Sequence, residues 1–97
     1  MTYKVKNLKE GSRPHPKGYK SWIDYWEEMT GRSAVYCHEV NCFSKATDGA
    51  HVQLSSDYND DSWYIVPLCH AHNTQFGETL SVVGPLVPVN PLNEIRW

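Results

Sequence analysis

The chain has 97 residues, a formal net charge of −2 and three cysteines. This length suits one small domain, and a chain so short buries only about 60–65% of its unfolded surface, so its core is marginal. Three cysteines cannot all pair in disulfides, and the N-terminus lacks a signal-peptide pattern. No apolar run is long enough to span a membrane. We therefore expect a cytoplasmic, reduced protein without a membrane partner, in which clustered Cys and His indicate a metal.

Charge is unevenly distributed along the chain. Residues 1–20 carry six basic residues against one acidic residue, whereas residues 21–97 carry three against ten. Prolines and glycines between positions 11 and 18 exclude a helix there. We expect a basic extended arm over 1–20, with a short strand at 3–5, followed by a single domain over 21–97. The arm either packs against the acidic body or binds nucleic acid. The candidate phosphate-binding residues are Lys4, Lys6, Lys9, Arg13, Lys17 and Lys20.

A helix is predicted to begin after Ser21. The Ser21 hydroxyl can cap the first turn, Asp24 stands three residues on, and Gly31 is a suitable C-cap. The face of this helix is aromatic, and we expect it to pack in the core rather than to stack on bases. It comprises Trp22, Trp26 and Met29, with Ile23 beside them and Tyr25 more to the side.

The rest of the chain alternates short strands with Cys- and His-rich turns. Strands are predicted at 34–36, 50–54, 63–68 and 79–83, with a hairpin loop between the second and the third. A short helix is predicted from Cys69 to about residue 76. The stretch 86–89 is expected to be extended, and the nearby prolines at 85, 88 and 91 exclude a central strand there.

Two turns hold all the cysteines. Cys37 and Cys42 are separated by four residues, and Cys69 and His72 by two. Short gaps of this kind let one turn present two ligands to a tetrahedral zinc ion. The intervening residues are enough for a hairpin that returns one pair to the other, which is the layout of a treble clef. We therefore predict a structural zinc ion on these four residues, with His38 and His70 as competing ligands.

The sequence resembles the HNH endonuclease family, the ββα-metal group of treble-clef nucleases, over about residues 36–76. The residues that carry the likeness are Cys37, Cys42, the segment Gly49-Ala50-His51-Val52 and the segment Val66 to Asn73. The resemblance implies an α+β fold, a small zinc-stapled ββα-metal core preceded by an N-terminal helix. It also implies a metal-dependent nuclease.

Carried over by position, His51 matches the general base of the family, and imidazole titrates in the range that a base requires. Asn73 matches a ligand of the catalytic Mg²⁺ or Mn²⁺ ion. Ala50 stands where the family has the principal Asp ligand, and alanine offers no side-chain oxygen. Asp48, or an acidic residue of the 55–62 loop, is the available replacement. The alternative for His51 is a histidine packed on a strand.

Two functional classes follow. The first is an HNH-like endonuclease in which His51 activates water beside a divalent ion at Asn73. The second is a non-catalytic treble-clef module that binds nucleic acid or a protein. The Ala50 substitution and the acidic body favour the second class.

Overall fold

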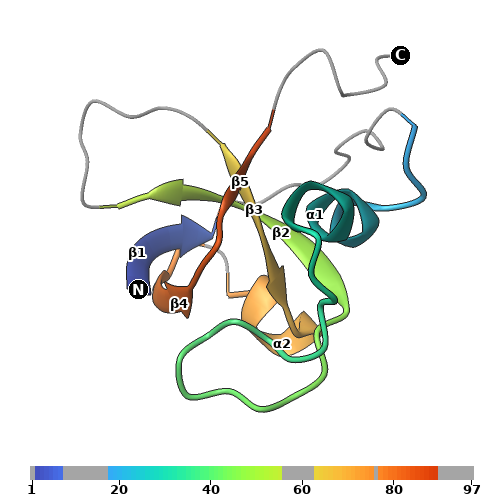
Figure 1. Cartoon of the computed structure of the whole chain (residues 1–97). Helices are drawn as coiled ribbons and strands as arrows, with labels where there is room; N and C mark the ends of the chain where they lie inside the picture. The colour runs from blue at the N-terminus through green and yellow to red at the C-terminus, as the bar shows by residue number, and fades with distance from the viewer. Residues whose placement is uncertain (1, 8–17, 56–62, 76, 90–97) are drawn as a thin grey trace.

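The computed structural model describes residues 2–7, 18–55, 63–75 and 77–89. Five strands form one sheet, and two helices pack beside it (Figure 1). The elements in chain order are β1 (Thr2–Asn7), α1 (Trp22–Thr30), β2 (Asp48–Leu54), β3 (Tyr64–Leu68), α2 (His70–Asn73), β4 (Thr79–Val83) and β5 (Val87–Pro88). This confirms the predicted α+β class. Neither helix of the described part of the chain has the length and apolar character needed to cross a membrane.

The sheet is antiparallel throughout, with the strand order β4-β1-β2-β3-β5. The N-terminal strand therefore lies inside the sheet, between β4 and β2. The boundary predicted after residue 20 does not separate this strand from the domain, because Val5 and Asn7 are fully buried. Lys4 and Lys6 alternate onto the exposed side, and the short strand predicted at 3–5 is the centre of β1.

Helix α1 begins and ends where the sequence predicts. The backbone N–H of Asp24 donates to the Ser21 hydroxyl at 3.2 Å, and Gly31 ends the helix at a φ of 69°. Its buried face is rotated from the predicted one. Tyr25 and Trp26 are 2% and 1% exposed, whereas Met29 is 49% exposed. The reason is that Tyr25 and Trp26 also donate hydrogen bonds to the carbonyls of Pro88 and Pro85.

Glycine at position 49 lets α1 lie directly on β2. A Cβ atom there would stand 2.6 Å from the carbonyl carbon of Trp22 and 2.7 Å from the backbone nitrogen of Ile23. A Cβ atom this close to the backbone of α1 would clash, so the close approach of the helix to the strand requires glycine. The side of β2 that carries position 49 therefore faces α1, and by alternation His51 faces it too.

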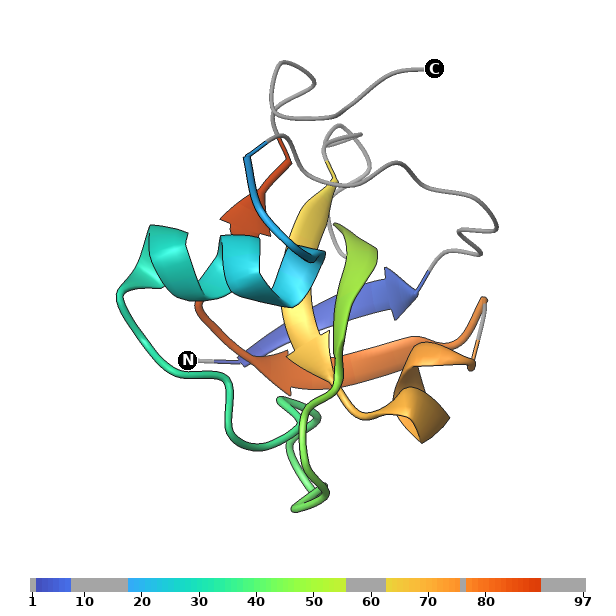
Figure 2. The same ribbon diagram turned by 90° about the vertical axis from the view of Figure 1, so that its right-hand side faces the viewer.

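The hairpin of β2 and β3 has a core on each face, and Figure 2 shows the two helices on different sides of it. One core, toward α2, contains Ala50, Val52, Val66 and Leu68 together with Val5 of β1. The other core, toward α1, contains Tyr25, Trp26, Ile65 and Val87. Side chains alternate between the two cores along each strand. Cross-strand pairs such as Ala50 with Val66 and His51 with Ile65 keep this parity.

The segment that carries Cys37 and Cys42 lies across one end of the sheet and is hydrogen-bonded to β3 and β4. The strand predicted at 34–36 is reduced to one isolated bridge between Tyr36 and Lys45. The next residues bond to two strands instead. The N–H of His38 donates to the carbonyl of Pro67 in β3, and the N–H of Val40 donates to Ser81 in β4. The backbone between Cys37 and Cys42, here called the knuckle, thus covers the outer edge of β4.

The C-terminal elements follow the prediction more closely. Strand β4 has the predicted bounds, and β5 is a two-residue edge strand, as expected for a proline-rich stretch. Helix α2 has four residues and is shorter than predicted. Residues 56–62 of the hairpin loop expected at 55–62, with its acidic residues, and Phe76 lie outside the described residues.

Candidate metal centre

The four predicted zinc ligands come together in the structure. One ligand atom from each of Cys37, Cys42, Cys69 and His72 lies within 4.8 Å of the others. Two come from the knuckle and two from the start of α2, which are 27 residues apart between Cys42 and Cys69. Convergence of segments this distant in the chain is the arrangement that the paired spacings predicted.

The distances fit a single tetrahedral ion. Sulfur and nitrogen atoms bound to zinc at about 2.3 Å and about 2.0–2.1 Å stand roughly 3.5–3.8 Å apart at the corners of a tetrahedron. Here Nδ1 of His72 lies 3.6 Å from Sγ of Cys37 and 3.4 Å from Sγ of Cys69. The sulfurs of Cys42 and Cys69 are 3.8 Å apart. The four side chains therefore could hold a zinc ion with little rearrangement.

Local backbone structure sets each ligand pair. Cys69 is the extended N-cap residue of α2, and the single helical turn after it brings His72 back to the same side. In the knuckle, the N–H of Cys37 donates to Ser44 at 2.8 Å, and the N–H of Cys42 donates to Glu39 at 3.0 Å. These bonds make a tight turn whose two cysteines share one side. Backbone hydrogen bonds therefore already hold the two cysteines on one side of the turn, and a bound ion would add to them.

The two knuckle thiols have different proton affinities. Burial raises the pKa of Cys37 to about 12, whereas hydrogen bonds from Ser44 lower the pKa of Cys42 to about 7. A metal ion must therefore displace a proton from Cys37 at neutral pH, while Cys42 is already partly a thiolate. The low dielectric that raises the first pKa also strengthens the attraction between that thiolate and a cation.

The competing histidines have other partners. Nδ1 of His38 lies 3.0 Å from the carbonyl oxygen of Val83, and its ring packs edge-on against Trp26 at 5.1 Å. Burial lowers the pKa of His38, which favours the neutral ring. Nδ1 of His70 lies 3.3 Å from Oδ2 of Asp48. Neither residue belongs to the Cys₃His group.

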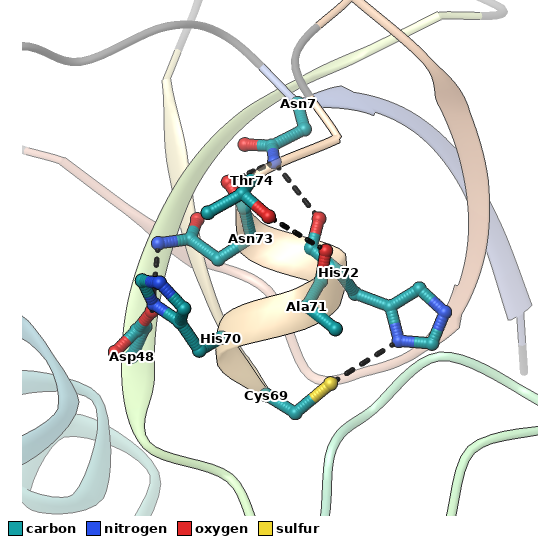
Figure 3. A network of polar contacts seen from close by, with 8 residues as sticks. All are labelled: Asn7, Asp48, Cys69, His70, Ala71, His72, Asn73 and Thr74. Carbon is teal, nitrogen blue, oxygen red and sulfur yellow. Dashed lines mark hydrogen bonds and ion pairs between the residues drawn. The ribbon is translucent and has the colours of Figure 1, made fainter.

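One residue that holds this centre was missed in the sequence. Asn7 is fully buried at the end of β1, and its Nδ2 donates to the carbonyl oxygens of His72 at 3.1 Å and Asn73 at 2.7 Å (Figure 3). The carbonyl of Asn73 lies at the helix end, where carbonyls lack an intrahelical partner, and the carbonyl of His72 also accepts from the N–H of Gln75 at 3.2 Å. Asn7 therefore ties the N-terminal strand to the metal-binding turn. The sequence could have revealed it, because Asn7 follows Tyr3 and Val5 at every second position of the strand and so shares their buried side.

The predicted catalytic residues do not come together. His51 is 2% exposed, and its ring packs against Trp22 at 4.8 Å and Trp63 at 6.1 Å. It faces α1. The side chain of Asn73 instead contacts Asp48, which by strand alternation points to the opposite side of β2. The sheet thus lies between the proposed base and the proposed metal ligand.

Position 50 has a packing role. Ala50 is 1% exposed within the core toward α2. A carboxylate at this position would be buried among Val52, Val66 and Leu68, where its charge would be costly. Asp48, at the entrance to the same strand, is the carboxylate that reaches Asn73.

The described basic residues of the predicted arm are dispersed. Lys4 and Lys6 lie on the exposed side of β1, and Lys20 is exposed just before α1. Lys9, Arg13 and Lys17 lie outside the described residues, so a phosphate-binding role for the six stays a prediction.

No known protein family, curated protein or solved structure matches this chain.

Proposed function

We propose that the protein is a zinc-stapled treble-clef module that acts by binding a partner and not by catalysis through His51. The observation that carries this proposal is the division of the predicted residues between two faces of β2. The metal ligands converge on one side, while His51 is buried between tryptophans on the other. A general base must come within hydrogen-bond reach of the water that it activates.

The zinc ion has a structural role in this proposal. Four protein ligands complete a tetrahedron and leave no position for water or substrate. The ion would join the knuckle to α2 and so hold the loop that covers β4. The expected content is one zinc ion per chain, measured by elemental analysis of the purified protein. A zinc-free protein that is well folded would contradict the proposal.

The partner is proposed to be a protein that docks on the knuckle. Four large apolar side chains in the knuckle or directly beside it, within residues 35–43, are exposed: Val35 by 54%, Tyr36 by 59%, Val40 by 38% and Phe43 by 83%. Exposed apolar and aromatic groups held on a rigid loop are typical of protein-binding surfaces. Lys45 and Arg32 flank this segment in the sequence and are exposed, which favours an apolar partner surface with acidic neighbours.

The binding proposal is tested by crosslinking at the knuckle. A photoreactive phenylalanine analogue replaces Phe43 in cells that express the full chain, and crosslinked proteins are identified by mass spectrometry. The same analogue at Met29, which is 49% exposed on α1, is the matched control. We expect one defined partner from position 43 that is absent from position 29. Crosslinks to the same proteins at both positions would contradict a knuckle-specific surface.

The endonuclease prediction is tested separately. Plasmid and single-stranded DNA are incubated with zinc-loaded protein and added Mg²⁺ or Mn²⁺, alongside the His51→Ala variant. The binding-module proposal expects intact DNA in every reaction. Cleavage by the natural chain that is lost in a folded His51→Ala variant would overturn it. Filter binding of labelled DNA and RNA at two salt concentrations tests the nucleic-acid alternative, since phosphate contacts weaken as salt rises.

A further inference from the structure

Two sulfur atoms of the Cys₃His group lie close enough to react with one another. Sγ of Cys42 and Sγ of Cys69 are 3.8 Å apart and belong to segments 27 residues apart in the chain. Neither cysteine is in a disulfide. A disulfide bond is about 2.0 Å long, so the two sulfurs must approach by a further 1.8 Å or about that to form one. The cluster therefore contains the two partners of a covalent link between the knuckle and α2.

We propose that oxidation by a peroxide joins Cys42 to Cys69 in a disulfide, which releases the zinc ion and replaces it as the link between the knuckle and α2. The Cys₃His group is thus a redox-sensitive switch between two alternative crosslinks. This inference rests on the structural zinc ion of the proposed function and is independent of the identity of the binding partner.

The exposure of the three cysteines sets which of them reacts first. Cys37 and Cys69 are only 5% and 7% exposed, whereas Cys42 is partly exposed and lies between the exposed residues Asn41 and Phe43. Oxidation of a cysteine depends on access of the oxidant to its sulfur. Peroxide should therefore react first with Cys42, and Cys69 supplies the sulfur that lies in contact with it.

The reaction takes place in two balanced steps. The Cys42 thiolate attacks one oxygen of hydrogen peroxide, the O–O bond breaks and hydroxide leaves, which gives a sulfenic acid. The Cys69 thiolate then attacks the Cys42 sulfur, so that an S–S bond forms, the S–O bond breaks and a second hydroxide leaves. The two sulfurs lose two electrons, which the two peroxide oxygens gain. Both hydroxides take up protons from solvent and become water.

Formation of this disulfide removes half of the zinc ligands. The thiolate is the form of cysteine that binds a metal, so Cys42 and Cys69 no longer contribute. Cys37 and His72 remain, whereas a structural zinc site uses four protein ligands. Cys37 stays a thiol, because the chain has three cysteines and the other two are paired. Zinc should therefore dissociate from the oxidised chain.

The choice of sulfur partner decides how the oxidised chain is held together. A disulfide between Cys37 and Cys42 would close the knuckle on itself and leave α2 without a link to it. A disulfide between Cys42 and Cys69 joins the same two segments that the zinc ion joins. The oxidised chain should therefore keep the knuckle beside α2 after the metal has left, since a crosslink between distant segments restricts the unfolded chain.

The test treats the full-length, zinc-loaded protein with hydrogen peroxide. A zinc-sensitive dye follows the release of the ion, alkylation marks the remaining thiols, and mass spectrometry of peptides locates the disulfide. We expect one zinc ion released per chain, alkylation of Cys37 alone and a disulfide between Cys42 and Cys69. A reductant with added zinc should restore the starting state.

Thermal scans compare the two ways of removing the ion. The oxidised chain should keep a cooperative transition at a lower temperature than the zinc-loaded chain, because the disulfide still joins the knuckle to α2. The reduced chain stripped of zinc by a chelator has neither link and should show no such transition. Identical scans for the oxidised and the stripped chains would contradict a replacement link.

Two matched variants separate the sulfurs while keeping four zinc ligands. Cys42→His and Cys37→His each leave two cysteines and two histidines, a set that also binds structural zinc. Cys42→His removes the exposed sulfur and should release zinc in peroxide more slowly by roughly tenfold or more. Cys37→His keeps the reactive pair and should release zinc at the natural rate. Zinc content before treatment shows which variants are folded, and peptide mapping of the natural chain requires neither of them.

Three outcomes would overturn the switch. These are a disulfide that includes Cys37 or joins two chains, loss of zinc without any disulfide, and a zinc-loaded Cys42→His variant that releases zinc as fast as the natural chain. A protein that contains no zinc in reducing buffer contradicts the proposed function itself. Zinc that is present at the start and leaves by another route contradicts the switch alone, so the two failures are distinguishable.

Discussion

The two faces of the β2–β3 hairpin are stabilised by different means. Toward α2 the buried residues are aliphatic side chains and cysteines, chiefly valine with two leucines and one alanine, and the Cys₃His group lies at their border. Toward α1 the core is aromatic, with Tyr25 and Trp26 surrounded by Tyr19 and Trp22. Aromatic residues bury large areas, so one helix suffices on that side. The α2 side is built from smaller side chains, and its helix of four residues is too short to be stable without further contacts.

This contrast teaches how a short chain divides its sources of stability. The aromatic face follows the ordinary rules of core packing, so its contributions should be graded with the size of the side chain removed. The α2 face also depends on a few specific contacts, namely the metal ligands and the hydrogen bonds of Asn7, so the fold of α2 should be lost abruptly when one of them is removed. The variants below separate the two expectations.

The largest effect is expected from removal of the metal. Structural zinc contributes an apparent binding free energy of about 10–16 kcal/mol in small zinc-finger peptides, which matches or exceeds the typical stability of a domain, about 5–15 kcal/mol. A strong chelator, or Cys69→Ser, should abolish the cooperative thermal transition measured by circular dichroism. Cys69→Ser that melts like the natural chain would show that the α2 face needs no ion.

The next largest effect is expected at Trp26. Truncation of a fully buried aromatic side chain costs about 3–5 kcal/mol. Trp26→Ala should therefore lower the free energy of unfolding in urea by that amount. The variant should still bind one zinc ion per chain, because Trp26 belongs to the other core and touches the knuckle through the ring of His38, which is not one of the four ligands. Zinc loss in a folded Trp26→Ala protein would mean that the two faces are not separable.

Asn7 tests the link between β1 and α2. Asn7→Asp has nearly the same shape but cannot donate to the carbonyls of His72 and Asn73. Leaving buried polar groups unpaired costs about 1–3 kcal/mol or more when one is charged. We expect faster zinc transfer to a colorimetric chelator as well as lower stability. Lys6→Gln, on the exposed side of the same strand, should change neither quantity.

The smallest effect is expected at the N-cap of α1. Ser21→Ala removes the acceptor of the Asp24 amide, and loss of such a cap costs about 0.5–2 kcal/mol. The melting temperature should fall by a few degrees, with the zinc content unchanged. Ser21→Asp keeps a capping oxygen and should restore the stability. A Ser21→Asp variant that melts like Ser21→Ala would contradict the capping role.

Sequence reasoning succeeded where the signal is local. The cap at Ser21, the stop at Gly31 and the spacing of the four ligands each depend on a few neighbouring residues, and the structure contains all of them. The strand hairpin also follows from alternation that can be read along the chain.

It failed where the partner is distant in the chain. The place of β1 inside the sheet depends on pairing with β4, more than 70 residues away, which no local pattern reveals. The burial of Tyr25 in place of Met29 depends on hydrogen bonds to the 85–88 segment. For His51 the catalytic and the packed alternatives both stayed open, because its direction depends on strand register and a shift by one residue would have turned it toward Asn73.

The cover that the knuckle places on β4 has a consequence for self-association. An uncovered strand edge is a template for pairing with another chain, and β4 reads Thr-Leu-Ser-Val-Val, a sequence with high strand propensity. The N–H of Val40 and the carbonyl of His38 now occupy that edge. If the ion is lost, the knuckle loses its anchor to α2 and the edge becomes available. Metal supply would then decide whether the protein stays dispersed or polymerises, and a zinc ion on the Cys₃His group would protect the chain from aggregation.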